Sequence, residues 1–379
     1  MKIAQVVAYP ISFRVTQEKG VSLGLGRTIK RDTVVVKVVT EDGVVGWGES
    51  HHGRAPGAVA HLINTTLREL IIGMDAREIV KVWNRIYRMQ ISSHGLGTAT
   101  TIAMSGIDTA LWDIKGKMAN MPLYRLLGGC NAPIDAYAGG ISLGYQPPAD
   151  LVEEVRVLVE TGYRAVKLRV GDNVPDDLRR VEAVREAFGD DLTILVDANT
   201  AYTLKDVRKA MPAFEALDVG WLEEPFSPAD AYNYAQAKLL GNVPLAAGEN
   251  HYTRHEFTQV IEDRSITIFQ PDVSKTGGVT EVMRIAAMAS GWKIPINPHT
   301  CTTSLNMAAT IHVLASIDNA GYFEADVAIE NPFRTEMTGL PYELSAEGCV
   351  VPLEAPGLGI EVDEKFIASH PLIDGPCFV

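Results

Sequence analysis

The stretch LTILVDAN, residues 192–199, is a short apolar run that ends in a carboxylate, and the chain repeats this design. VGWLEEP (219–225) and PLAAGEN (244–250) follow it, separated by amphipathic segments. Apolar runs that alternate with helix-like segments indicate a parallel β/α sheet, and eight such strands close most economically into a barrel. The other five runs are IDAYA (134–138), YRAVKLRV (163–170), ITIFQPD (266–272), KIPINPH (293–299) and GYFEAD (321–326).

The segments between these runs carry helix signals. PADLVEEVRVLVETG (148–162) has proline at its start and glycine at its end, and TLKDVRKAMPAFEALD (203–218) opens on a threonine in a capping position. No clear helix follows the eighth run. The sequence therefore predicts an α/β fold in which eight strands alternate with seven helices.

The first 125 residues have a different pattern. Two strand-like runs, residues 2–15 and 33–50, flank a glycine-rich segment, and the second contains the hairpin signal EDG. Helical periodicity follows over residues 61–70, 76–89 and 98–118. We expect an N-terminal α+β capping domain over 1–125, a barrel over 126–349, and a C-terminal segment, 350–379, that returns to the cap.

Composition excludes several classes of protein. The net charge of −13 argues against nucleic acid and against an anionic membrane surface as partners. No apolar run reaches the roughly 18 residues of a membrane span. The four cysteines are scattered, with neither a disulfide framework nor a CxxC metal motif, so we expect a reduced, cytoplasmic compartment.

Nearly every predicted barrel strand ends in an ionisable residue. Asp197, Glu223 and Glu249 end three consecutive strands, and the C-terminal ends of parallel strands meet at one mouth of a barrel. Three clustered carboxylates repel one another unless a cation neutralises them, and oxygen ligands suit Mg²⁺. Each acid taken alone is equally explained by capping of the next helix. Together, at spacings of 26 residues, they predict a Mg²⁺ site.

Asp272 and His299 end the next two strands, and Glu324 lies on the last one. A carboxylate on a neighbouring strand end fixes the tautomer of an imidazole and raises its basicity, which makes a general base. A protonated Glu324 at the barrel mouth would donate a hydrogen bond to a charged intermediate. Glu324 as a purely structural residue is the alternative.

The run AVKLRVGD, residues 165–172, places Lys167 and Arg169 on the same face of a buried strand. Two buried like charges are costly unless anions compensate them. A barrel mouth with metal-binding carboxylates and an anionic substrate supplies that compensation. A divalent metal with lysine and histidine bases suits proton abstraction next to a carboxylate, with the enediolate stabilised by the metal.

These motifs together resemble the enolase superfamily, mandelate racemase subgroup, and the resemblance covers the whole chain. It implies a capping domain, a modified (β/α)7β TIM barrel and a C-terminal return to the cap. It also implies Mg²⁺ bound by Asp197 (VDAN), Glu223 (WLEEP) and Glu249 (AGEN). The implied dyad is Asp272 (QPD) and His299 (NPH).

Further roles follow from the same resemblance. Glu324 would be hydrogen-bonded to a substrate carboxylate oxygen, and Lys167 matches the first lysine of the family's Lys-x-Lys motif, which contacts that carboxylate. Asn199 and Lys275 match polar positions near the metal and the dyad. The cap supplies specificity in similar enzymes, and here it offers Arg27, Lys30, His51, His52 and Arg54, of which Arg27, His51 and Arg54 are our substrate-binding candidates. As a set they suggest a polar or anionic distal group.

Arg169 departs from the family pattern, because the racemases carry a lysine base at this position. Deprotonating arginine at pH 7 costs roughly 7 kcal/mol or more, against about 4–5 kcal/mol for lysine. A two-base racemase is therefore disfavoured. A dehydratase needs only His299, with Arg169 binding substrate oxygens, and the charge of Arg169 would lower the pKa of Lys167 beside it.

The sequence thus predicts a Mg²⁺-dependent acid-sugar dehydratase of carbohydrate acid catabolism that acts on a small-molecule carboxylate. It would remove the α-proton and the β-hydroxyl to give a 2-keto-3-deoxy acid. A racemase, epimerase or sugar-lactone cycloisomerase with the same enediolate chemistry is the alternative. A non-catalytic metal-binding scaffold has no need of Asp272 and His299 together. By analogy, we expect a homo-oligomer.

Overall fold

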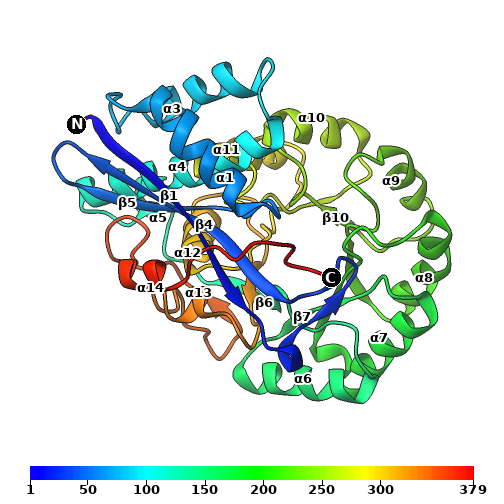
Figure 1. The fold of residues 1–379 in the computed structure, drawn as a ribbon. Helices are drawn as coiled ribbons and strands as arrows, with labels where there is room; N and C mark the ends of the chain where they lie inside the picture. The colour runs from blue at the N-terminus through cyan, green and yellow to red at the C-terminus, as the bar shows by residue number, and fades with distance from the viewer.

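A parallel barrel of strands forms the larger part of the molecule (Figure 1). The computed structural model describes the whole chain, residues 1–379. In chain order the barrel strands are β6 (Ile134–Gly139), β7 (Ala165–Arg169), β8 (Thr193–Asp197), β9 (Val219–Glu223), β10 (Leu245–Ala247), β11 (Ile268–Phe269) and β12 (Phe323–Asp326).

The seventh barrel strand is reduced to a single bridging residue, and the barrel closes through this residue. Ile296 bridges Phe269 on one side and Ala320 on the other, and β12 then pairs in parallel with β6. Pro295 and Pro298 flank this position, and proline lacks the N–H that would extend a ladder. All eight predicted strand positions therefore exist, with the seventh shortened to a bridge.

A helix follows each of the first seven strand positions. Thr203 starts α8 with a capping box, because its hydroxyl accepts from the Asp206 N–H while the Asp206 carboxylate accepts from the Thr203 N–H. After β12 only a single turn, α13 (Pro332–Thr335), is present. The prediction of a TIM-barrel-like (β/α)7β fold is thus confirmed. The seven helices are α6 (Pro148–Thr161), α7 (Val174–Phe188), α8 (Leu204–Ala216), α9 (Ala231–Ala237), α10 (Thr253–Asp263), α11 (Gly278–Ser290) and α12 (Ser304–Leu314).

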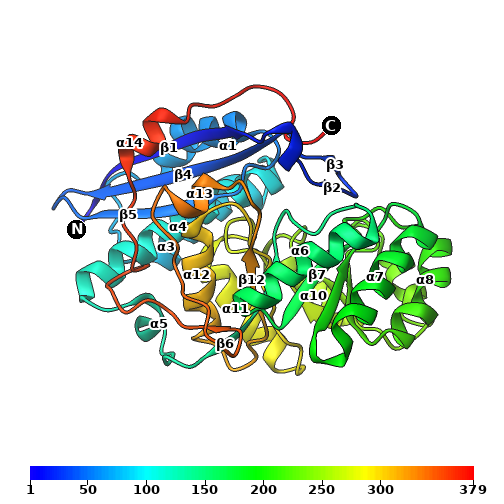
Figure 2. The same cartoon turned by 90° about the horizontal axis from the view of Figure 1, so that it is seen from below.

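The N-terminal part is a three-stranded antiparallel sheet packed on helices, and Figure 2 shows this sheet lying along one side of the barrel. Its strands are β1 (Ile3–Arg14), β4 (Lys30–Thr40) and β5 (Val45–Ser50), with β4 in the centre. Gly48 of β5 approaches α4 (Gly97–Ala119) so closely that an added Cβ would lie 2.2 Å from the Gly106 carbonyl oxygen. Glycine is therefore required for this sheet–helix contact.

The remaining cap elements are short. A hairpin of β2 (Ser22–Leu23) and β3 (Gly26–Arg27) projects from the sheet, preceded by the turn η1 (Gln17–Lys19). None of the helices is long and apolar enough to cross a membrane. The helical segments predicted near residues 61–70 and 76–89 are present as α1 (Pro56–Leu62), η2 (Ile63–Leu67) and α2 (Arg68–Ile71), and as α3 (Ile79–Ile86) and η3 (Tyr87–Ile91).

The C-terminal segment runs from the barrel back to the cap, as the sequence predicts. β13 (Cys349–Val350) pairs with the start of β6, and α14 (Glu364–Ser369) lies against the cap sheet, where Glu364 pairs with Lys37 at 2.6 Å. Further on, Phe378 bridges Thr28 beside β3. The domain limits at residues 125 and 349 stay predictions.

Apolar side chains dock the cap on the barrel. Trp47 and Val35 of the cap sheet belong to the same buried cluster as Leu305 of α12, Val279 of α11 and Phe366 of α14. The cap and barrel cores are otherwise separate clusters. This shared cluster holds the cap in a fixed position over the strand ends.

His312 of α12 lies at the junction of barrel, α5 (Leu123–Leu126) and C-terminal segment. The Tyr124 N–H donates to Nδ1 (3.2 Å), so Nε2 carries the ring proton and donates to the Leu358 carbonyl (3.2 Å). Burial lowers the pKa of His312 from 6.5 to about 4. The folded protein therefore binds fewer protons than the unfolded chain between these pH values, and its stability falls as the pH falls.

We expect His312→Gln to remove this pH dependence. Through His312 the wild type should lose about 3 kcal/mol of unfolding free energy as the pH falls from 6.5 to 4. The variant is less stable at pH 7, but the gap between the two melting temperatures should narrow toward pH 4, as scanning fluorimetry at stepped pH would show. His94→Gln, at an exposed position, should keep the wild-type profile. A gap that stays constant with pH would contradict the assignment.

Candidate active site

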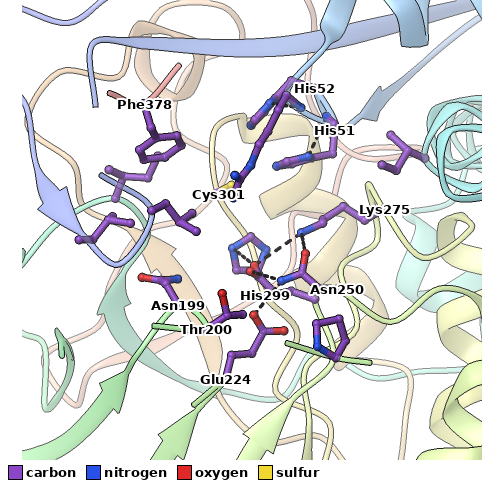
Figure 3. A pocket seen from close by; sticks show the side chains of 18 of the residues that line it. His51, His52, Asn199, Thr200, Glu224, Asn250, Lys275, His299, Cys301 and Phe378 are labelled. Atoms are coloured by element: carbon purple, nitrogen blue, oxygen red, sulfur yellow. Dashed lines mark hydrogen bonds and ion pairs between the residues drawn. The ribbon is translucent and has the colours of Figure 1, made fainter. Parts of the chain in front are cut away.

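A cavity of about 420 Å³ lies between the C-terminal ends of the barrel strands and the cap (Figure 3). This is the size range of small-molecule sites. The barrel contributes polar side chains to its wall, and the cap and the C-terminal segment contribute the opposite side. The wall includes Arg169, Asn199, Glu224, Glu249, Asn250, Lys275, His299 and Cys301 from the barrel, and Leu23, His51, His52, Arg54 and Phe378 from the cap side.

His299 and Asp272 form the pair that the sequence predicts. Asp272 Oδ2 lies 2.7 Å from His299 Nδ1, while Asp272 Oδ1 accepts from the Ser274 N–H (2.7 Å) and from Asn306 Nδ2 (3.1 Å). The ring is therefore fixed with Nδ1 toward Asp272, and Nε2 lies 2.7 Å from Glu249. Although burial alone would lower it, Glu249 and Asp272 raise the pKa of His299 well above its ordinary value.

The three predicted metal ligands lie on adjacent strand ends but have different exposures. Asp197 and Glu223 are directly paired in register on β8 and β9, and Glu249 follows β10. Glu249 borders the cavity, whereas Asp197 (2% exposed) and Glu223 (1% exposed) lie beneath its wall. Each carboxylate contacts a basic side chain: Asp197 pairs with Arg169, Glu223 with Lys167 and Glu249 with His299.

The donor set nevertheless fits a hard divalent cation. Burial and the neighbouring Asp197 raise the pKa of Glu223 to about 8, despite its 2.6 Å contact with Lys167. Two acids side by side and a third from the next strand are an excess of buried negative charge, which a divalent cation would relieve. Asp197, Glu223 and Glu249 are thus the residues that would hold Mg²⁺.

A second group, Asp32, His52 and Cys377, brings its ligand atoms within 4.8 Å of one another. Its chemistry is unsuited to a cation. The Lys30 ammonium already lies 3.0 Å from Asp32 Oδ2. His52 Nδ1 accepts from the Arg54 N–H (2.8 Å), so its other nitrogen carries the proton and has no lone pair to offer.

Lys167 and Arg169 share one face of β7, as predicted, but they reach different depths. Lys167 is fully buried and contacts Glu223 (2.6 Å), Glu324 (2.9 Å) and Asp197 (3.6 Å). Arg169 lies at the cavity wall, where its guanidinium pairs with Asp197 and donates to Asn199 (3.1 Å). Lys167 therefore neutralises carboxylates beneath the site, and Arg169 is the cation that a substrate would meet.

Two predicted protonation states are wrong. Burial alone would lower the pKa of Lys167, but Glu223 and Glu324 raise it well above its ordinary value, so the net shift is upward and not the predicted lowering. Glu324 is a carboxylate and not a protonated donor. It accepts from the N–H groups of Gly140 (2.9 Å) and Thr300 (3.1 Å), and although burial opposes it, Lys167 holds the pKa of Glu324 at about 2.

The predicted substrate-binding residues divide into two groups. Asn199, Lys275, His51 and Arg54 line the cavity. Arg27 does not, because its guanidinium donates to the Gln17 carbonyl (2.7 Å) and to Ser22 (3.3 Å) next to its own hairpin. A role for Arg27 in substrate binding has no support in this geometry.

Several residues of the cavity wall were not among the sequence candidates. Glu224 is buried, with Oε2 accepting from Asn250 (2.7 Å) and Oε1 without a partner. Burial, and after it Glu249, raise the pKa of Glu224 well above its ordinary value. The doubled acid in WLEEP is a signal for Glu224, whereas Cys301 and Phe378 have no local signal at all.

Known proteins match this chain in both parts. Residues 11–128 match the model for the mandelate racemase/muconate lactonizing enzyme N-terminal domain, and residues 150–366 match the enolase C-terminal domain-like model. A crystal structure of an enolase superfamily member from Polaromonas sp. JS666 has a TM-score of 0.98 and 52% identity, over 100% of both chains. A racemase from Streptomyces coelicolor A3(2) with bound magnesium has a TM-score of 0.89 and 30% identity, over 98% of this chain and 100% of that one.

Two curated relatives carry names of activities. The 3,6-anhydro-α-L-galactonate cycloisomerase of Streptomyces coelicolor is 33% identical over 89% of this chain and 91% of its own length. The arabinonate dehydratase of Saccharolobus solfataricus is 33% identical over 89% of this chain and 90% of its own length. Both activities involve sugar acids.

Proposed function

This chain belongs to the mandelate racemase/muconate lactonizing enzyme family of the enolase superfamily, and from that premise we propose that it is a Mg²⁺-dependent acid-sugar dehydratase. The observation that carries the proposal is the His299–Asp272 dyad at the cavity, together with an arginine on β7 where a second base would be needed. His299 is held by Asp272 on one side, whereas the corresponding cation on β7 is an arginine paired with Asp197. One base suffices for elimination.

The proton transfers follow from the position of His299. His299 lies in the cavity wall, and its Nε2 lies 2.7 Å from Glu249, the contact that raises its pKa. With Glu249 engaged by the Mg²⁺ that it would hold, the neutral imidazole would take the proton α to the substrate carboxylate through Nε2, leaving the electron pair in an enediolate. The imidazolium then gives this proton to the β-hydroxyl, which leaves as water. Tautomerisation of the enol gives the 2-keto-3-deoxy acid. Asp272 keeps the ring oriented and stabilises its protonated form.

The cations around the cavity support this role. Arg169 and Lys275 present positive charge at the wall, which suits an anionic substrate and the negative charge that develops on its carboxylate. Glu324, held as a carboxylate by two N–H groups and Lys167, fixes the position of Lys167 under the site. Mg²⁺ held by Asp197, Glu223 and Glu249 would supply an electrophile that stabilises the enediolate oxygens.

Cycloisomerisation of a sugar lactone is the second candidate, favoured by a relative of that name at 33% identity. It begins with the same proton abstraction and differs in the group that leaves. A homo-oligomeric state and a cytoplasmic location remain our predictions.

We expect turnover to require Mg²⁺. The enzyme treated with EDTA should lose at least about 100-fold in rate on a panel of acid sugars, and added Mg²⁺ should restore it. Semicarbazide detects the 2-keto acid product. Deuterium incorporation at Cα without keto acid would favour an isomerase, and neither result on a broad panel would overturn the proposal.

A further inference from the structure

The cap side and the barrel side of the cavity carry different sets of polar side chains. In Figure 3, His51, His52 and Phe378 lie on the opposite side of the cavity from Asn199 and Glu224, with His299 between them. Anything that reaches from His299 toward the cap therefore ends among these cap residues and Arg54. The substrate atoms distant from the reacting carbon would be recognised there.

Arg54 is the one cation of the cavity wall without a carboxylate partner. Arg169 pairs with Asp197, and Lys275 lies 3.7 Å from Glu249. The guanidinium of Arg54 makes no salt bridge and lies over the ring of Phe378, 5.9 Å from its centroid. A guanidinium placed on an aromatic face keeps its N–H groups free for a planar anion.

The backbone conformation at Gly53 and Arg54 fixes the position of the Arg54 side chain. Gly53 (φ 53°) and Arg54 (φ 59°) are both in the left-handed region, which turns the chain sharply after β5. A non-glycine residue adopts this conformation only where the surroundings enforce it, and here the Arg54 N–H is fixed on His52 Nδ1 (2.8 Å). Arg54 is therefore held at the cavity by its own backbone and by Phe378.

The two histidines beside Arg54 add neutral donors. His51 Nδ1 accepts from the Gly53 N–H (3.1 Å), as His52 Nδ1 does from Arg54, so each ring carries its proton on Nε2. The rings lie 4.0 Å apart, and burial lowers the pKa of both, so they are uncharged. Asp32, near His52, is already paired with Lys30 at 3.0 Å, and Glu249, the acid that acts on both rings, contacts His299 at 2.7 Å.

We propose that Arg54, with the adjacent histidines, binds a second carboxylate of the substrate, so that the enzyme prefers sugar dicarboxylates (aldarates) to aldonates. This rests on the proposed function for the reacting end. One guanidinium and two neutral donors match a singly charged, planar carboxylate. Arg54 is an exposed residue of the cavity wall, so with a neutral terminal hydroxymethyl group its guanidinium would stay paired with water and gain no charge-assisted hydrogen bond.

The subsite is tested with a pair of six-carbon acids that have the same stereochemistry and differ only at the far end of the chain. An example is galactarate, a dicarboxylate (hexarate), against galactonate, a monocarboxylate with a terminal hydroxymethyl group (hexonate). The wild type should favour the hexarate at least about 30-fold in kcat/KM. Arg54→Gln should lower kcat/KM for the hexarate about 100-fold, mainly through KM, and lower that for the hexonate only about threefold. Phe378→Leu should weaken hexarate binding by a smaller factor, about fivefold.

Arg27→Gln is the matched control, since Arg27 lies on the same side of the cap but off the cavity. It should leave the preference unchanged. Isothermal titration of both acids against the Mg²⁺-loaded wild type and Arg54→Gln gives a readout without turnover. Equal loss for both acids in Arg54→Gln, or no binding preference in the wild type, overturns the subsite. If keto acid forms from hexonates alone, the proposed carboxylate subsite is wrong but the dehydratase proposal stands. If hexarates bind through Arg54 but no acid sugar is turned over, the subsite stands and the dehydratase proposal is wrong.

Discussion

Replacing His299 with asparagine should lower kcat about 10³-fold while leaving KM within about threefold. Asparagine cannot take or return a proton, but it keeps the polar contact with Asp272, and the cations that bind the substrate stay in place. Keto acid formation by the semicarbazide assay measures the loss. Solvent deuterium incorporation at Cα should fall by a similar factor, because the same nitrogen removes the α-proton.

Two further variants test whether the loss of activity is specific to the proposed base. Asp272→Asn keeps the imidazole but removes the carboxylate that fixes its Nδ1 proton, so kcat should fall less, by about 10- to 100-fold. His94→Asn, at an exposed position outside the cavity, should not change kcat. Full turnover in His299→Asn would mean that another group is the base.

Replacing Lys167 with methionine should destabilise the metal-free protein by about 3–5 kcal/mol, or about 10 °C in melting temperature. The ammonium is fully buried and compensates Asp197, Glu223 and Glu324 at once. Without it, three buried carboxylates share only Arg169 and the polar groups around them. Mg²⁺ should therefore raise the melting temperature of the variant more than that of the wild type.

Lys37→Met is the control for this substitution. Lys37 makes an ion pair of the same length, 2.6 Å, with Glu364, but that pair is partly exposed. Its loss should cost no more than about 1 kcal/mol. If Lys167→Met melts like the wild type in EDTA, the buried lysine does not hold the three carboxylates together.

The barrel is predictable from the sequence because its signals are local. Each strand is a short apolar run, each helix has its own start and end signals, and the ionisable residue at the strand end marks the mouth. The register then brings Arg169, Asp197 and Glu223 together on adjacent strands without any further information. For the same reason the pairing of Asp272 with His299 follows from strand order alone.

Protonation states and the cap side of the cavity are not local in this way. The ionised state of Glu324 depends on N–H groups of Gly140 and Thr300, which lie 184 and 24 residues away in the chain. Arg27 and Arg54 look alike in the sequence, but only Arg54 meets Phe378, a residue from the other end of the chain. No pattern in either segment indicates that contact.

The path of the chain also bears on how this protein could be re-engineered. Backbone pairing joins the N-terminal part of the cap to the C-terminal segment at Ile11–Pro371, Thr28–Phe378 and Arg27–Val379. The barrel is therefore an insertion within the cap. A chimera that takes only the first 125 residues from a donor would join one half of a cap to a foreign second half. Grafting a new specificity therefore needs two crossover points, one before β6 and one after β13.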